Sequence, residues 1–226
     1  MSIVKNTARL LSVNWIKSIL VNLYYFPFAK AVRLPILFGW GVRIGALGKP
    51  GCVDVPNKFG SICFALKKGP FTLGNNLSYW YIGKDSKLKV CGSCRISKGS
   101  TVKVFDGAEL SFGDKFSSNA DMIISCASKI IFGDDCLLGW KVSIMDNDGG
   151  HQIYANNKLI NQARPIIIGD HVWIGMESTI LKGANIASGC VVGCKSNVCG
   201  LISNQSNSVI IGNPAIEKKN NIIWEH

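Results

Sequence analysis

The sequence is poor in histidine and, over its first quarter, contains no acidic residue. Three histidines occur among 226 residues, and residues 1–53 hold seven basic residues without one Asp or Glu. Long apolar runs are also missing, because the charge-free stretch between Lys17 and Lys30 has 12 residues, whereas a transmembrane helix needs about 20. The first residues lack the apolar run and cleavage site of a secretory signal. We therefore expect a cytoplasmic protein with no spanning segment in this region.

Several motifs that would identify a function are absent as well. The sequence shows no P-loop, dinucleotide fingerprint, nucleophile elbow or EF-hand loop. The net charge of +11 indicates an anionic partner, such as a phosphorylated ligand or a membrane surface. Nucleic acid is not expected as that partner, because no basic recognition helix, zinc finger or aromatic RNA-binding motif is present.

Cysteine is plentiful, but the number of cysteines is odd and their spacing is not that of a metal site. Cys91-Gly-Ser-Cys94 has no second pair and no nearby histidine to complete a zinc site. In a reduced cytoplasm we expect the cysteines to act as small core residues rather than as nucleophiles. The nine are Cys52, Cys63, Cys91, Cys94, Cys126, Cys136, Cys190, Cys194 and Cys199.

The C-terminal half contains a strict six-residue repeat of aliphatic residues. The unbroken run consists of Ile168, Ile174, Ile180, Ile186, Val192 and Val198. Neither a helix nor a strand has this period, whereas a coil with three short flat sides returns every sixth residue to the same inner position. The repeat therefore predicts a parallel β-solenoid over residues 54–211. The six-residue spacing is interrupted by a shift in the phase of the repeat around residues 104–131.

A helix is expected within the basic N-terminal segment. Over residues 7–26 the apolar side chains fall on one face, and the polar side chains of Asn14, Ser18 and Asn22 fall on another. Two roles stay open for this helix. It can cap the open end of the solenoid, or residues 1–45 can contact the inner face of the cytoplasmic membrane peripherally.

One polar stretch, residues 145–165, interrupts the repeat and reads as a loop projecting from one corner. Loops on rigid scaffolds often carry function, and this loop contains His151. A histidine can act as a general base near neutral pH if a carboxylate fixes its tautomer, and Asp146 and Asp148 are both candidates. Residues 212–226 are expected to leave the solenoid as a short C-terminal extension.

The other two histidines are not expected to take part in chemistry. His171 lies beside Asp170 at a solenoid corner, where a structural role is expected, and His226 is the last residue. The gamma-class carbonic anhydrases bind zinc on such a solenoid through three histidines. Here His151 and His171 are 20 residues apart without a third nearby, so no metal is expected.

Three segments together resemble the hexapeptide-repeat acyltransferases. They are the run IIIGDHVWIGMESTILKGANIASGCVVG, the loop containing DNDGGHQIY and the tail IGNPA. The chain is similar to galactoside and maltose O-acetyltransferases, and more so to bacterial capsule and lipopolysaccharide O-acetyltransferases. The resemblance implies an all-β fold, a left-handed parallel β-helix, which departs from the usual right-handed crossover. It also implies a homotrimer that binds acetyl-CoA in a groove between neighbouring subunits.

The resemblance also assigns roles to residues. It makes His151 the base that deprotonates a sugar hydroxyl, and Asn119 matches the interface asparagine that positions the reacting groups. The residues that match the acetyl-CoA groove are Trp173, Gly175, Met176, Gly193, Cys194, Gly212, Asn213 and Pro214. Lys195 departs from the family by replacing a glycine, and Lys195, Lys218 and Lys219 are candidates to meet the CoA phosphates.

The function expected on these grounds is acetyl-CoA-dependent O-acetylation of a sugar hydroxyl. The acceptor would be a capsule, O-antigen or exopolysaccharide, or a precursor of one, and its hydroxyl would attack the thioester directly. Two alternatives stay open: an N-acetyltransferase acting on an amino sugar, and a catalytically silent trimeric solenoid used for binding or assembly. The sequence does not determine the acceptor sugar or the hydroxyl that is modified.

Overall fold

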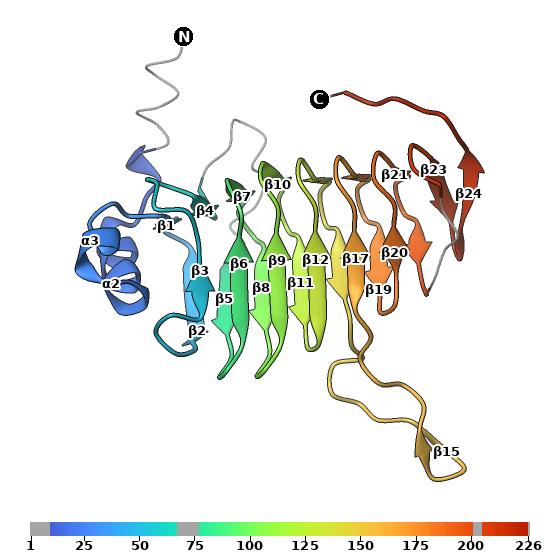
Figure 1. Ribbon diagram of the computed structural model, residues 1–226, viewed down its shortest axis with the longest axis horizontal. Helices are drawn as coiled ribbons and strands as arrows, with labels where there is room; N and C mark the ends of the chain where they lie inside the picture. Colours follow the sequence, from blue (N-terminus) through green and yellow to red (C-terminus); the bar gives the residue numbers. More distant parts are fainter. Residues whose placement is uncertain (1–9, 67–76, 201–204, 226) are drawn as a thin grey trace.

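The chain forms a three-sided parallel β-helix with a helical segment at its N-terminal end (Figure 1). The structure, a computed structural model, describes residues 10–66, 77–200 and 205–225. The expected start of the helix at residue 7 and the terminal His226 lie outside these ranges. In the described part of the chain, three long sheets form the three sides, and we call them sheets I, II and III.

Sheet I is the longest of the three sides. Its strands, in order along the solenoid, are β1 (Ile36–Phe38), β4 (Ile62–Phe64), β7 (Cys94–Ile96), β10 (Phe116–Ser118), β13 (Leu137–Leu138), β18 (Trp173–Ile174), β21 (Val191–Val192), β23 (Val209–Gly212) and β24 (Ala215–Lys219). All neighbours in this sheet are parallel except β23 and β24, which form an antiparallel pair at the C-terminal end.

Sheets II and III are parallel throughout. Sheet II contains β2 (Val42–Leu47), β5 (Ser78–Ile82), β8 (Thr101–Val104), β11 (Ile123–Cys126), β14 (Ser143–Met145), β19 (Thr179–Leu181) and β22 (Asn197–Val198). Sheet III contains β3 (Val53–Asp54), β6 (Lys87–Val90), β9 (Glu109–Phe112), β12 (Lys129–Phe132), β17 (Ile166–Ile168) and β20 (Asn185–Ile186). A small separate hairpin pairs β15 (Tyr154–Ala155) with β16 (Lys158–Leu159).

The coils shorten along the chain, which explains why the six-residue repeat is strict only near its end. Cys94 pairs with Phe116, a step of 22 residues, Ile124 with Ile144, a step of 20, and Ile174 with Val192, a step of 18. Only the last value equals three hexads. The phase slip expected around residues 104–131 therefore corresponds to longer coils.

The solenoid also begins earlier than the sequence suggested. The first strand, β1, already pairs in parallel with β4, and Ile36 lies beside Ile62. The step between these two residues is 26, so the first coil carries no hexad signal. For this reason the expected boundary at residue 54 falls inside the β-helix, which begins at Ile36.

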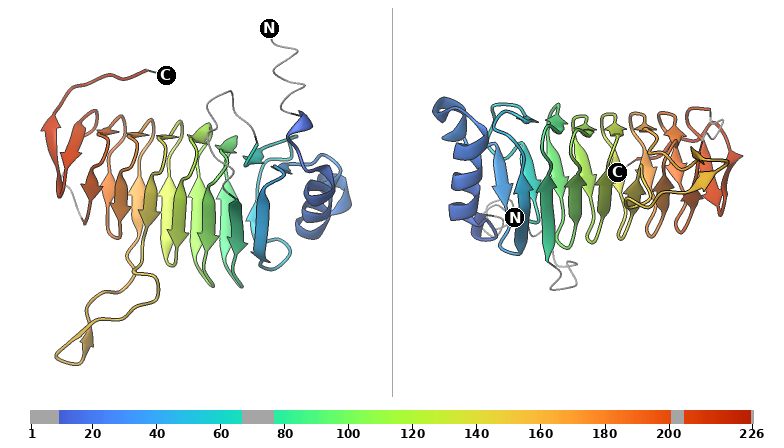
Figure 2. Two further views of the ribbon diagram at one scale, coloured as in Figure 1. Left: turned by 180° about the vertical axis from the view of Figure 1, so that it is seen from behind. Right: turned by 90° about the horizontal axis from the view of Figure 1, so that it is seen from below.

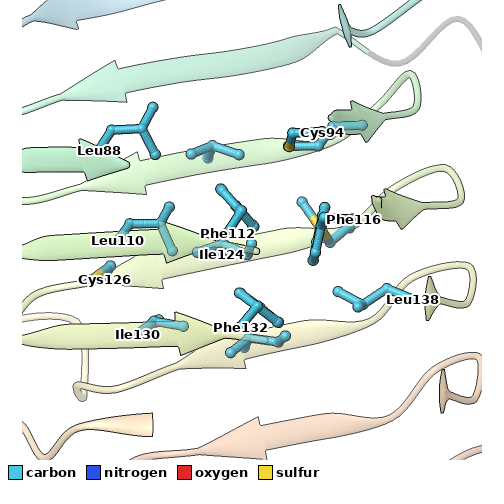
Figure 3. Packing of buried hydrophobic residues seen from close by; sticks show 14 of the residues in the cluster. Leu88, Cys94, Leu110, Phe112, Phe116, Ile124, Cys126, Ile130, Phe132 and Leu138 are labelled. Carbon is cyan, nitrogen blue, oxygen red and sulfur yellow. The ribbon is translucent and has the colours of Figure 1, made fainter. Parts of the chain in front are cut away.

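Stacked apolar side chains fill the interior (Figure 3). Leu88, Leu110 and Ile130 occupy equivalent positions in successive coils, and the rings of Phe112 and Phe132 stack with centroids 5.3 Å apart. Each fully buried side chain of this size stabilises the fold by about 1.5–3 kcal/mol. Because each residue packs on its equivalent one coil away, the core extends along the whole solenoid.

Aspartates at the corner between sheets III and I connect the coils. The side chain of Asp114 accepts a hydrogen bond from the backbone nitrogen of Ser93 at 2.7 Å, and the side chain of Asp134 accepts one from Asp114 at 2.6 Å. The Asp170 side chain continues the series by accepting from Asp134 at 2.8 Å. The backbone bond from Ser93 lowers the pKa of Asp114. These three aspartates therefore stabilise the corner.

Helix α2 (Trp15–Tyr25) lies across the N-terminal end of the solenoid (Figure 2). The Asn14 side chain caps it by accepting from the backbone nitrogen of Lys17 at 3.0 Å. The helix ends before Pro27, as expected, and the short α3 (Phe28–Ala31) follows. Among the described residues, no helix is long and apolar enough to cross a membrane.

The C-terminal segment folds back onto sheet I after β24. Trp224 is nearly buried, and its ring stacks on His171 with centroids 4.0 Å apart. The indole nitrogen donates to the backbone oxygen of His171 at 3.0 Å. Residues 212–225 therefore include a strand and a docked tail.

Candidate active site

Two corners of the solenoid carry the residues expected to perform chemistry. The corner between sheets II and III bears the long loop with His151, and the corner between sheets I and II bears Asn119 and most of the expected acetyl-CoA residues. Sheet II separates the two corners within one chain. The fold therefore brings together the groove residues, but it does not bring His151 to Asn119.

The loop leaves the solenoid after β14 and returns at β17, projecting sideways from the stack (Figure 1). Its tip is the hairpin of β15 and β16, in which Asn156 and Asn157 have φ values of 48° and 59°. Asn tolerates this left-handed conformation, so the pair forms a tight hairpin turn. The polar stretch that breaks the repeat thus has an ordered structure of its own.

His151 lies on the exposed surface of the loop and lines a pocket of about 240 Å³. The pocket lies between the loop and the solenoid, because Phe105 and Ala127 from two earlier coils line it together with Asn147 and Gln152. It is open to solvent on one side and mixes aromatic, amide and imidazole groups. Such a lining suits a polar ring compound.

Asp146, the first carboxylate candidate, holds the backbone at the base of the loop. Its side chain is fully buried and accepts hydrogen bonds from the backbone nitrogens of Ala127, Ser128 and Lys129 at 2.7–2.8 Å. The Asn147 amide donates to it at 2.9 Å. Asp146 therefore fixes the corner below the loop, and its carboxylate is occupied by these donors rather than by the His151 imidazole.

Asp148, the second candidate, lies on the loop and joins a polar cluster that shapes it. Its carboxylate accepts from the side-chain amide of Asn161 at 2.7 Å and forms an ion pair with Lys182. The hydrogen bond from Lys182 lowers the pKa of Asp148. Asn161 also donates to the backbone oxygen of His151 at 2.9 Å. Asp148 therefore supports the His151 backbone through Asn161.

Phe105, Asn161 and Lys182 are site residues that the sequence did not reveal. Phe105 lies 46 positions before His151 and reaches the pocket only because the coils stack. Lys182 follows β19 in the next coil. No spacing or motif marks these residues, since their proximity depends on coil length and on the path of the loop.

The corner between sheets I and II contains a column of glycines. A Cβ on Gly139 would lie 2.6 Å from the backbone nitrogen of Met176, and a Cβ on Gly175 would lie 2.6 Å from that of Cys194. A Cβ on Gly193 would lie 2.9 Å from Ile211. Coils can stack this closely only where these positions are glycine. The corner therefore presents a backbone surface without side chains at these three positions.

Exposed side chains border this glycine column. Met176 and Cys194 lie at the corner itself, and Trp173 lies nearby on the outer face of β18. Lys195 adopts a φ of 56°, which explains why glycine is common at this position, and its ammonium lies 3.6 Å from Glu177. Apolar side chains beside an exposed lysine fit an extended acyl carrier that ends in phosphates.

Other expected residues lie at the ends of this corner. Asn119 is half-buried after β10, and its backbone nitrogen donates to Leu138 at 2.8 Å. Asn213 and Pro214 follow β23 at the C-terminal end, where the Asn213 side chain accepts from Asn197 at 3.2 Å. Trp140, which the sequence did not single out, is exposed at this corner directly before Lys141.

Neither a metal site nor a reactive buried thiol is found in the described residues. They contain no group of three or more His, Cys, Asp or Glu side chains that could hold a metal ion. Burial raises the pKa of Cys136 to about 12 and also raises the pKa values of Cys94 and Cys126. A thiol with a raised pKa is a poor nucleophile at neutral pH.

His171 binds the C-terminal tail. Its Nε2 lies 3.0 Å from the backbone oxygen of Trp224, and its Nδ1 lies 2.8 Å from the carboxylate of Asp135. These two contacts raise the pKa of His171. This arrangement agrees with the structural role expected for His171.

Comparison with known proteins identifies several that are similar to this chain. No protein-family model matches the chain. An uncharacterized 24.8 kDa protein in the cps region of Klebsiella pneumoniae is 34% identical over 67% of this chain and 67% of its own length. The polysialic acid O-acetyltransferase of Neisseria meningitidis is 35% identical over 49% of this chain and 58% of its own length. A solved maltose O-acetyltransferase from Clostridium difficile is 30% identical over 64% of this chain and 70% of that chain, with a TM-score of 0.42.

The chain belongs to the hexapeptide-repeat acyltransferases. Its parallel solenoid is the left-handed β-helix of this family. The chain spans little more than half the length of several curated relatives that it matches. In this hexapeptide-repeat protein, the glycine column and the His151 loop occupy the two corners that adjoin sheet II.

Proposed function

We propose that this hexapeptide-repeat protein transfers an acetyl group from acetyl-CoA to a sugar hydroxyl of a cell-surface polysaccharide or of its precursor. The observation that carries the proposal is the placement of His151. It is exposed in a structured loop, lines a pocket, and has its backbone held by Asn161 and Asp148. A flexible, unsupported histidine would not hold an acceptor hydroxyl in line for attack.

In the proposed mechanism, His151 acts as the general base. Its imidazole takes the proton of the acceptor hydroxyl while the hydroxyl oxygen forms the new ester bond, and the imidazolium returns the proton to the departing sulfur. Acetyl-CoA supplies the activated acetyl group. Asn119 is the side chain proposed to position the reacting groups, and a backbone amide at the glycine corner would stabilise the charge that develops on the carbonyl oxygen.

The corner between sheets I and II is proposed to hold acetyl-CoA. Gly175, Met176, Gly193 and Cys194 would contact the pantetheine arm along the glycine column, with Trp173 beside the thioester. Asn213 and Pro214 would lie near the adenine, and Lys195, Lys218 and Lys219 are exposed where phosphates would be. Because His151 and Asn119 lie on different corners, we propose a homotrimer in which one subunit supplies each to a shared site.

The acceptor is proposed from the names of relatives and from the pocket. Curated relatives include polysialic acid O-acetyltransferases and a putative lipopolysaccharide biosynthesis O-acetyl transferase, WbbJ of Escherichia coli. The pocket beside His151 has a mixed polar lining that suits a saccharide. N-acetylation of an amino sugar is the less favoured alternative.

We further propose that the reaction takes place at the inner face of the cytoplasmic membrane, with residues 1–45 in peripheral contact with it. Lipid-linked precursors of surface polysaccharides would be available there. The basic residues of this segment and its lack of acidic residues support the proposal.

Replacing His151 tests the proposed chemistry. We expect His151→Ala to reduce acetyl transfer to an acceptor polysaccharide by about 10²–10⁴-fold, because a general base contributes that much. Lys158→Ala, an exposed change at the loop tip, should keep the wild-type rate. Release of acetate from the product by mild alkali distinguishes an ester from an amide. A wild-type rate in His151→Ala would rule out the assigned base.

Cys194 provides a test of acetyl-CoA binding that does not depend on catalysis. Alkylation of exposed Cys194 should slow when acetyl-CoA is added, whereas alkylation of exposed Cys91 on a different corner should not change. The same protection is expected in His151→Ala. Equal labelling of both cysteines with and without acetyl-CoA would favour the catalytically silent solenoid.

A further inference from the structure

Helix α2 is oriented opposite to the usual amphipathic helix, because its polar stripe faces the protein and its apolar stripe faces outward. Ser18 and Asn22, two uncharged polar residues of the helix, are fully buried. Ile16 and Leu20 on the opposite side are 73% and 62% exposed. A soluble protein normally buries such an apolar stripe against its core.

The polar stripe is buried because the first strand of sheet I needs hydrogen-bond partners. Strand β1 pairs with β4 on one side only, so its other edge would leave backbone groups unpaired. Ser18 Oγ accepts from the backbone nitrogen of Phe38 at 3.0 Å, and Asn22 accepts from the nitrogen of Ile36 at 3.1 Å while donating to its oxygen at 2.7 Å. These side chains take the place of a missing strand.

The consequence is a broad apolar surface at the end of the molecule. The exposed residues on α2 and α3 that form it, which we call the end face, are Trp15, Ile16, Ile19, Leu20, Leu23, Tyr24 and Phe28. A contiguous apolar patch of this kind on a soluble protein marks an interaction surface. The mixture of aliphatic residues with Trp and Tyr is typical of helices that lie in a membrane interface.

The positive charge near the end face favours an anionic partner. The first 53 residues contain seven basic residues and no acidic one, and Lys17, Lys30 and Arg33 lie on or beside the two helices. The ammonium groups of Lys17 and Lys30 donate to backbone oxygens of the first coil, and Arg33 is exposed. The basic residues beside the apolar stripe match a bilayer with anionic headgroups. We infer that the end face binds the surface of an anionic lipid bilayer, with α2 lying parallel to it. This inference rests on the membrane location in the proposed function.

This orientation limits which acceptors can reach the site. Since α2 lies across the end of the solenoid, the coils stack away from the bilayer (Figure 2). The His151 loop follows β14, which is four strands beyond β2 in sheet II, so it stands roughly 20 Å farther from the bilayer than the first coil. A lipid-linked acceptor would reach His151 only if several sugar units separate its lipid from the modified sugar.

Vesicle sedimentation of the full chain tests the inference. Wild type should sediment with phosphatidylcholine vesicles that contain about one third phosphatidylglycerol, and less with phosphatidylcholine alone. Ile16→Ser should weaken this binding about tenfold or more, because burying an isoleucine side chain is worth at least that factor. The matched control Ile223→Ser changes a residue that is 91% exposed near the C-terminus and should bind like wild type.

Three outcomes would overturn the inference. The first is equal sedimentation of Ile16→Ser and wild type, and the second is equal binding of wild type to neutral and anionic vesicles. The third is association of wild type without vesicles, seen by light scattering and lost in Ile16→Ser, which would make the end face a contact between copies of this chain. Acetyl transfer to a water-soluble acceptor, measured in parallel, should be unchanged by Ile16→Ser. If Ile16→Ser loses vesicle binding but keeps acetyl transfer, the proposed chemistry is therefore not contradicted.

Discussion

Asp146 shows at the scale of single residues how a carboxylate at the base of the His151 loop can be structural. Its buried carboxylate accepts hydrogen bonds from three backbone N–H groups and one side-chain amide. Asp146→Asn turns one acceptor oxygen into a donor that faces these groups. We expect the free energy of unfolding to fall by about 2–3 kcal/mol, since hydrogen bonds to charged groups are worth this much. Denaturant unfolding measures the change.

Asp148→Asn is the matched control for this prediction. The side chain of Asp148 is 37% exposed, and its partners Lys182 and Asn161 are half-buried. Ion pairs at the surface contribute little to stability, so the unfolding midpoint should stay near that of wild type. Comparable destabilisation by the two substitutions would contradict the structural role of Asp146.

The sequence could predict the loop that carries His151 but could not choose between the two carboxylates. The loop was identifiable because it is the long interruption of a regular repeat. Asp146 and Asp148 differ by only two positions, yet the side chain of Asp146 is buried against the solenoid and that of Asp148 is exposed. Which of the two faces the solenoid depends on the packing of earlier coils, and the six-residue period carries no information about it.

At the scale of elements, the C-terminal tail is held by a contact that depends on pH. The protonated ring of His171 can donate from Nε2 to Trp224 and from Nδ1 to Asp135 at once, which raises its pKa above the ordinary value of 6.5. A group with a raised pKa in the folded state stabilises that state fully below its unfolded pKa. This contribution is lost as the pH rises through the folded pKa.

We therefore expect the tail to detach more readily as the pH is raised from about 6 to about 9. Limited proteolysis at Lys218 and Lys219, both exposed just before the tail, should become faster over this range. His171→Gln can still donate to Trp224 but does not titrate, so its cleavage rate should follow only the pH dependence of the protease. The prediction is wrong if wild type and His171→Gln show the same pH profile.

The lengths of the coils and the orientation of α2 show what the sequence patterns could not predict. The strict hexads correctly predicted the last coils, whose step is 18 residues, but the first coils are longer and gave no periodic signal. The amphipathic pattern predicted a helix over residues 7–26, of which α2 covers Trp15–Tyr25 while residues 12–14 are not helical. The pattern left the orientation of α2 open. The polar face turned inward because the edge of β1 needed partners, and that need is visible only once the sheet is assembled.

At the scale of the whole molecule, sheet II separates the two halves of the proposed site. Asn119 follows β10 at one edge of this sheet, and the His151 loop follows β14 at the other. A cyclic trimer with sheet II facing its axis would bring the first edge of one subunit to the second edge of its neighbour. The monomer fold alone thus argues for a site that two chains share.

Mixing two inactive variants tests this shared site. Asn119→Ala and His151→Ala should each lose most activity as pure proteins. In trimers assembled from equal amounts of the two, roughly a quarter of the sites would combine an intact Asn119 from one subunit with an intact His151 from the next. Unfolding the two together and refolding them should therefore restore activity to roughly a quarter of the wild-type rate, whereas mixing without unfolding should restore none. Sites built within one chain could never be rescued, because every chain in the mixture carries a defect.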